Sequence, residues 1–106
     1  KQTIMGKWES IAFIGKKDWD ASQNKVLLSI DSMGLVSIET QMKSELGLII
    51  NHTEAQLVGD YIFVNNKRNK VFALDNARQL KLIDEEKGQS IVFERKRASW
   101  SNSSSR

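Results

Sequence analysis

The stretch VLLSIDSMGLVSIET, from Val26 to Thr40, decides the fold of this chain. It contains two short apolar runs joined through Ser32-Met33-Gly34, and the glycine can take the left-handed conformation that closes a three-residue hairpin loop. A loop of this length brings two pairs of apolar residues face to face: Ile30 with Val36, and Leu28 with Ile38. Turn chemistry, register and apolar matching therefore all predict an antiparallel hairpin here.

Similar apolar runs recur along the chain between polar turn clusters, and their regular spacing is typical of an all-β sandwich or barrel. Nowhere does a helical period persist over three turns, and the stretch 39–46 has room for one helical turn at most. The glycine at position 59 predicts a bend within a longer strand. The eight strands predicted in this way are 7–14, 26–30, 35–40, 46–51, 55–64, 70–74, 79–83 and 90–96.

The turns 65–69 and 85–88 predict two further hairpins. Their expected facing pairs are Phe63 with Phe72, Val64 with Val71, Leu82 with Ile91, and Leu80 with Phe93. Short connections make sequential strands antiparallel neighbours, and closure removes both exposed edges of such a meander. The predicted fold is therefore all-β, an eight-stranded antiparallel up-and-down barrel. We expect this domain to span residues 1–97, followed by a flexible polar tail at 98–106.

The composition excludes several classes of site. The chain has 106 residues and no cysteine, which removes disulfides, thiolate metal sites and cysteine nucleophiles together. A net charge of +3 permits an acidic partner without requiring one. No apolar run approaches the roughly 20 residues of a membrane helix. Because the chain begins at Lys1 rather than Met, we expect a processed or trimmed chain. A membrane contact is expected only if a lipid anchor is present upstream of Lys1.

The first and last predicted strands carry a more specific signal. Gly6-Lys7-Trp8 opens the first strand, and Arg95 lies late in the last one. In a closed barrel these strands pair, which brings Trp8 and Arg95 to the same end, where a guanidinium can stack on an indole. This arrangement resembles the lipocalin and fatty-acid-binding (calycin) superfamily, particularly its short bacterial members. The resemblance spans residues 6–97 and implies that Gly6, Trp8 and Arg95 form the floor of a lipocalin-like barrel.

The same resemblance implies a small apolar or amphipathic ligand held inside the barrel. The chain departs from the family in being shorter than a typical lipocalin, and a shorter barrel has less room for a cavity. Trp19 lies in the charged loop 15–24 at the expected mouth, where it either covers a cavity or folds back on the barrel. The runs 46–50 and 61–64 are apolar on both faces, which predicts either a roomy cavity with an outer dimer contact or a packed interior with a covered outer face. The candidate ligand-binding residues are Trp19, Leu28, Ile30, Ile38, Leu48, Tyr61, Phe63 and Phe72.

No catalytic or metal-binding pattern stands out. His52 is the only histidine, and we expect it in a solvated turn without further metal ligands nearby. The acidic run Asp84-Glu85-Glu86 falls in a predicted turn, where neighbouring carboxylates point into water rather than converging in a cleft. The basic groups at 67–70 and 95–97 lack exposed aromatic platforms for bases. We therefore predict no enzymatic activity, no metal, no cofactor and no nucleic-acid partner.

The sequence leaves two hypotheses about function open. The leading hypothesis is a non-enzymatic lipocalin-like binding protein of bacterial origin. We expect a secreted protein or lipoprotein, extracytoplasmic or at the cell surface, with the cytoplasm as the alternative location. The alternative is a protein-interaction or inhibitor module that uses the barrel as a scaffold and the loop 15–24 as its contact surface. A protein partner or a homodimer would fit this alternative.

Overall fold

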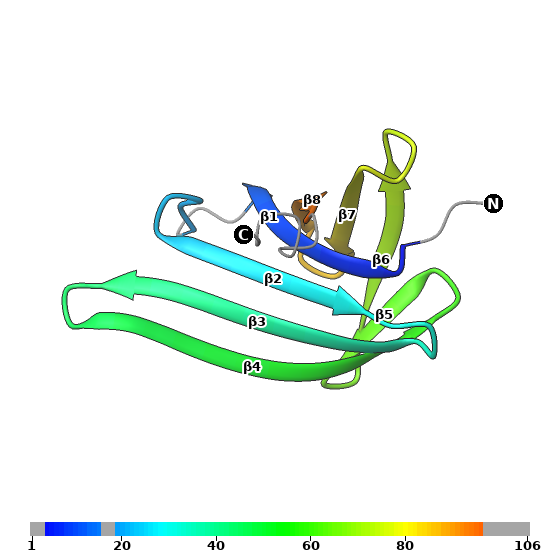
Figure 1. Ribbon diagram of the computed structural model, residues 1–106, viewed down its shortest axis with the longest axis horizontal. Coiled ribbons are helices and arrows are strands. Elements are labelled where there is room, and N and C mark those ends of the chain that lie inside the picture. The colour runs from blue at the N-terminus through cyan, green and yellow to red at the C-terminus, as the bar shows by residue number, and fades with distance from the viewer. Residues whose placement is uncertain (1–3, 16–18, 97–106) are drawn as a thin grey trace, which may run out of the picture.

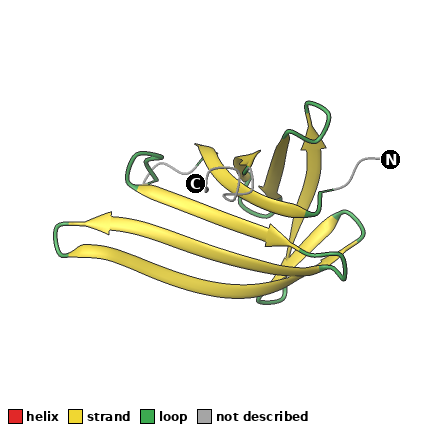
Figure 2. Cartoon of the chain, in the orientation of Figure 1, coloured by secondary structure: helices red, strands yellow, loops and turns green. Residues whose placement is uncertain are grey.

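The computed structural model describes residues 4–15 and 19–96, and this part of the chain forms a closed antiparallel barrel (Figure 1). All regular secondary structure in these residues is strand, as Figure 2 shows. The strands follow one another around the barrel in chain order, which confirms the predicted fold class. Their bounds are β1 (Gly6–Ile14), β2 (Asn24–Ile30), β3 (Leu35–Ser44), β4 (Gly47–Val58), β5 (Tyr61–Val64), β6 (Lys67–Leu74), β7 (Gln79–Asp84) and β8 (Gln89–Arg95). The predicted tail, 98–106, lies outside the described residues.

The barrel closes because β1 pairs with β8 as well as with β2. Trp8 lies opposite Leu28 of β2 on one side and opposite Arg95 of β8 on the other. The β1–β8 register shifts between Ser10 and Ala12, and such a bulge exchanges the inner and outer faces of a strand. Phe13 packs against the core as a result.

The hairpin between β2 and β3 forms as predicted. Gly34 has a φ of 84°, in the left-handed region that this loop requires. Its carbonyl accepts a 2.8 Å hydrogen bond from the Leu57 N–H of β4. A Cβ at position 34 would lie 3.0 Å from the carbonyl oxygen of Leu57, so glycine also allows β4 to approach closely. The confirmed facing pairs are Ile30 with Val36, Leu28 with Ile38, Leu82 with Ile91, and Leu80 with Phe93.

The middle of the chain differs from the prediction. The predicted strand 46–51 and the first part of 55–64 form one continuous strand, β4, of 12 residues. The chain turns at Gly59, whose φ is 63°, instead of bending there. His52 therefore lies in a strand, and the prediction of a turn at this position was wrong. The polar residues around His52 are mostly exposed on β4, so their polarity reflects contact with solvent rather than a turn.

The register between β5 and β6 also differs from the prediction. The observed pairs are Phe63 with Arg68 and Val64 with Lys67, in place of Phe63 with Phe72 and Val64 with Val71. The chain reverses within two residues, Asn65 and Asn66, whose φ angles are 51° and 67°. Asparagine enters the left-handed region more readily than most residues, so a tight turn forms here without glycine. The prediction failed because it assigned a five-residue loop to this segment.

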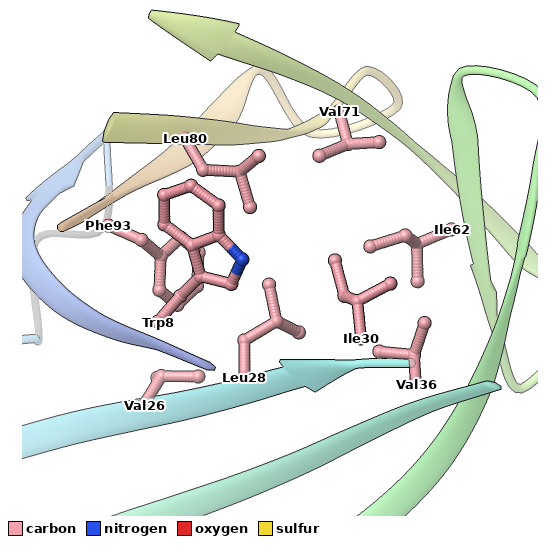
Figure 3. Packing of buried hydrophobic residues seen from close by; sticks show 9 residues of the cluster. All are labelled: Trp8, Val26, Leu28, Ile30, Val36, Ile62, Val71, Leu80 and Phe93. Atoms are coloured by element: carbon pink, nitrogen blue, oxygen red, sulfur yellow. The ribbon is translucent and has the colours of Figure 1, made fainter. Parts of the chain in front are cut away.

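Nine apolar side chains fill the interior of the barrel (Figure 3). None is more than 4% exposed, and full burial of a side chain of this size stabilises the fold by about 1.5–3 kcal/mol. They come from every strand except β4. The nine are Trp8, Val26, Leu28, Ile30, Val36, Ile62, Val71, Leu80 and Phe93.

Strand β4 supplies none of these residues because much of it runs beyond the barrel. The hairpin of β3 and β4 extends far past the short strand β5, and β2 lies alongside it (Figure 1). We call this three-stranded region, residues 24–28, 38–44 and 47–54, the wing; its base includes the core residues Val26 and Leu28. One face of the wing continues the inner surface of the barrel, and the other continues its outer surface.

Candidate functional site

The end of the barrel that holds Trp8 is closed by Arg95. The guanidinium carbon lies 4.2 Å from the centre of the indole ring, and Trp8 is fully buried. The same guanidinium donates hydrogen bonds to the carbonyl oxygens of Met5, at 2.7 Å, and Ala77, at 3.0 Å. Arg95 thus ties the segment before β1 and the turn before β7 to the ring. The contact expected from the sequence between Trp8 and Arg95 is present.

Gly6 makes room for this arrangement. A Cβ at this position would lie 2.7 Å from a terminal nitrogen of Arg95, and the φ of 125° strains any other residue. The indole N–H of Trp8 donates a 2.9 Å hydrogen bond to the Ile4 carbonyl, which orients the ring. Gly6, Trp8 and Arg95 therefore pack together at this end of the barrel.

Two of the candidate ligand-binding residues are buried too deeply for a ligand to contact them. Leu28 is 1% exposed and Ile30 is 2% exposed, and both belong to the packed core. A ligand would have to displace their neighbours, because protein interiors are packed as densely as organic crystals.

Four further candidates face the outside of the barrel. Successive residues of a strand point to opposite faces, so the neighbours of the buried Ile62 and Val71 point outward. Phe63 and Phe72 are 39% and 37% exposed there. The outward-facing candidates are Leu48, Tyr61, Phe63 and Phe72. A ligand inside the barrel would touch none of them.

Trp19 lies at the opposite end of the barrel from Trp8, in the loop between β1 and β2. Its ring meets Phe13 edge to face, with centroids 5.1 Å apart, and packs against the core. The neighbouring Asp20 accepts hydrogen bonds from the backbone N–H and the hydroxyl of Ser22, at 2.9 and 2.8 Å. These two hydrogen bonds hold the pKa of the Asp20 carboxyl below its usual value, and the bond from the backbone N–H has the larger effect. Trp19 is therefore folded back on the barrel by an ordered turn.

The inner face of the wing leaves a mixed apolar and polar surface accessible at the mouth of the barrel. The register extends the inner face from the buried β2 residues across β3 and β4. Ile49, on this face, is 46% exposed, while Ile38 and Met42 are partly buried. The residues that share this face are Ile38, Thr40, Met42, Ile49, Asn51 and Thr53. Of these, the sequence identified Ile38 alone; continuing the pairing from Leu28 and Ile38 toward the hairpin tip would have found the others.

Several ionisable groups in the described residues make structural contacts. The imidazole Nε2 of His52 lies 2.6 Å from the hydroxyl of Ser37 across the outer face of the wing. Glu85 and Glu86 lie 3.9 and 3.8 Å from the cationic groups of Arg68 and Lys67 on the neighbouring turn. Over residues 4–15 and 19–96, no three His, Asp or Glu side chains group as metal ligands. No helix in this part of the chain is long and apolar enough to cross a membrane.

Comparison with solved structures places this architecture among known proteins. The chain is similar to Ex-FABP, a siderocalin described as functioning through dual ligand specificities, with a TM-score of 0.57. The likeness covers 90% of this chain and 75% of that one, at 14% sequence identity. The fold is a lipocalin-like barrel. No family model and no curated protein matches the sequence. At this identity the lipocalin-like barrel carries the likeness, and the site must be argued from its own residues.

Proposed function

We propose that this lipocalin-like barrel is a non-enzymatic binding protein that holds a small amphipathic molecule at its mouth, on the inner face of the wing. The observation that supports this is the division of the inner surface into two parts. The nine core residues fill the end near Trp8, whereas Ile49 leaves nearly half of its surface accessible on the same inner surface. Ile49 is thus an exposed apolar side chain on a surface that elsewhere forms the core, and exposed apolar surface of this kind marks a candidate ligand site.

The side chains of this face define the chemistry of the ligand. Met42 and Ile49 lie opposite each other in the β3–β4 register and offer a flexible apolar contact. Thr40 pairs with Asn51 one step further in, where a hydroxyl and an amide can bond a polar group. An aliphatic or aromatic body with one polar group would therefore fit, and selectivity would come from these few polar atoms.

The test is a titration with a fluorescent fatty acid and its displacement by unlabelled amphiphiles. We expect saturable binding that Ile49→Lys weakens by about tenfold or more, because a charge would replace apolar contact. Leu35→Lys is the matched control: Leu35 is 55% exposed, faces outward, and should leave binding unchanged. The absence of saturable binding in the wild-type protein, or equal effects of the two substitutions, would refute the proposal.

A second candidate is an interaction module that uses the barrel as a scaffold. The loop 15–24 supplies a poor contact surface, because Trp19 turns toward Phe13 rather than toward solvent. The exposed aromatic side chains Phe63 and Phe72 favour the outer face of β5 and β6 instead. Phe72→Ala should then abolish capture of a protein partner without lowering thermal stability. Capture that survives Phe72→Ala and is lost in Trp19→Ala would assign the contact to the loop.

The location of the protein is also part of this proposal. A lipocalin-like carrier of amphipathic molecules fits a bacterial secreted protein or lipoprotein, extracytoplasmic or at the cell surface. The sequence encoded upstream of Lys1 tests this directly. A signal peptide ending in a lipid-modified cysteine would support a surface lipoprotein, and an initiating Met directly before Lys1 would support the cytoplasm.

A further inference from the structure

Strand β4 has an open edge. Its partner β5 pairs only with the last three residues, Gln56, Leu57 and Val58. Over 47–55, no described strand pairs with β4 on the side away from β3. The β3–β4 ladder continues along this whole stretch, so the backbone is held extended while one side stays open.

The backbone groups on this edge follow from the alternation of the ladder. Leu57 donates its N–H to Gly34, on the β3 side. In an antiparallel pair every second residue bonds to the same neighbour, so the odd-numbered residues of β4 bond to β3 and the even-numbered ones point away. Val58 and Gln56 direct their groups to β5 in this way. Leu48, Ile50, His52 and Glu54 therefore present their N–H and C=O groups along the open edge.

This edge carries almost none of the features that block strand pairing. Natural edges are protected by lysine, proline, bulges or inward-pointing charges. The stretch 46–55 has no proline and no lysine, and Glu54 is its one acidic residue. Leu48 and Ile50 are each 54% exposed on the outer face, and Leu46 at the tip is 99% exposed. The edge is thus extended, and it is apolar near the hairpin tip, where its backbone groups are available for pairing.

We propose that a second copy of this chain covers the edge, β4 against β4, antiparallel, with the two-fold axis at Ile50. In this register Ile50 faces Ile50 of the second copy, and Leu48 faces its His52. All of these residues present backbone groups to the edge, so three facing pairs form two hydrogen bonds each. Glu54 faces Leu46 of the second copy, so no two charges of the same sign lie directly opposite.

The neighbouring strand limits this register on one side. Phe63 of β5 pairs with Gln56, so Val64, the last residue of β5, lies level with Ala55 of β4. A register shifted by two residues toward Glu54 would push the hairpin tip at Leu46 into Phe63 of the second copy. Centring on Ile50 keeps the tip clear of β5. A dimer joined by one strand pair buries less than the roughly 800 Å² per partner of a standard interface, so its formation should depend on concentration.

The test is sedimentation velocity of the full chain over a concentration series from about 1 µM to about 1 mM, a range that covers weak self-association. We expect a rising sedimentation coefficient that reaches the value of a dimer. Ile50→Lys would place two lysines opposite each other and weaken association by about tenfold or more. Val58→Lys is the matched control, because Val58 is 57% exposed on the same strand but its edge is already covered by β5.

Amide hydrogen exchange provides a second, site-resolved measurement. On raising the concentration, the amides of Leu48, Ile50 and His52 should become protected, whereas Ile49 and Asn51 are protected by β3 at every concentration. A monomer throughout the series, or a dimer that Ile50→Lys leaves intact, would overturn the proposal. The two proposed sites are separable, since Ile50 faces outward: Ile50→Lys should abolish the dimer and retain fluorescent fatty-acid binding at Ile49.

Discussion

Replacing Arg95 by alanine should destabilise the barrel far more than its exposure indicates. The substitution removes the cation over Trp8 and two charge-assisted hydrogen bonds to backbone carbonyls. A cation–π contact with a buried ring contributes about 1–2 kcal/mol, and a hydrogen bond to a charged group about 1.5 kcal/mol or more. Because water can hydrate the freed carbonyl of Met5, we expect a net loss of about 3 kcal/mol. That is a large part of the 5–15 kcal/mol typical of a whole domain.

The assay is urea denaturation followed by circular dichroism, with thermal melting as a second measurement. A loss of about 3 kcal/mol should lower the melting temperature by about 12 °C or more in a domain of this size. Arg68→Ala is the matched control, since its guanidinium lies 4.6 Å from the centre of the Tyr61 ring on the exposed face. Exposed contacts of this kind are weak, so we expect a loss of less than about 1 kcal/mol. Equal losses in the two variants would refute the assignment of Arg95 to the floor.

Three further predictions concern single positions. Gly6→Ala should lower the melting temperature, because the added Cβ would lie 2.7 Å from the Arg95 guanidinium and a φ of 125° is strained for alanine. Gly47→Ala is the control: its φ of 126° is nearly the same but no atom lies within 4 Å of the added Cβ, so its effect measures the backbone strain alone. Ser10→Ala removes the buried hydroxyl that accepts a 2.9 Å hydrogen bond from the Val26 N–H, and should lower the free energy of unfolding, measured by urea denaturation, by about 1–3 kcal/mol. An unchanged free energy of unfolding would contradict this hydrogen bond. Asn66→Val should destabilise the β5–β6 turn and Asn66→Gly should not, because the φ of 67° suits glycine; equal melting temperatures would contradict the turn geometry.

Much of the fold was predictable because several local signals agreed. The loop at Gly34 sets the register of β2 and β3, and the same reasoning succeeded for the pair Leu80 and Phe93. The prediction failed around His52, where an exposed strand is polar enough to resemble a turn. It failed again at Asn65, because the left-handed conformation that shortens the loop is rare outside glycine.

The candidate site was less predictable than the fold. Leu28 and Ile38 face each other as expected, but one lies in the packed core and the other at the edge of the accessible wing. Aromatic side chains favoured Phe63 and Phe72 as lining residues, yet the β4–β5 and β6–β7 registers turn their neighbours Ile62 and Val71 inward and so place both aromatic side chains outside. Apolarity identifies residues that prefer burial; it does not say which face of a strand becomes the inner one.

By itself the sequence determined an antiparallel meander and the two residues, Trp8 and Arg95, that meet where it closes. Both features depend on the residues of each short turn and on the order of the strands, which can be read directly from the sequence. Only the tertiary structure decided that Ile49 faces the mouth, that Ile50 faces outward, and that the edge of β4 is open. Those properties depend on the lengths of neighbouring strands, since the four residues of β5 are too few to cover the twelve of β4.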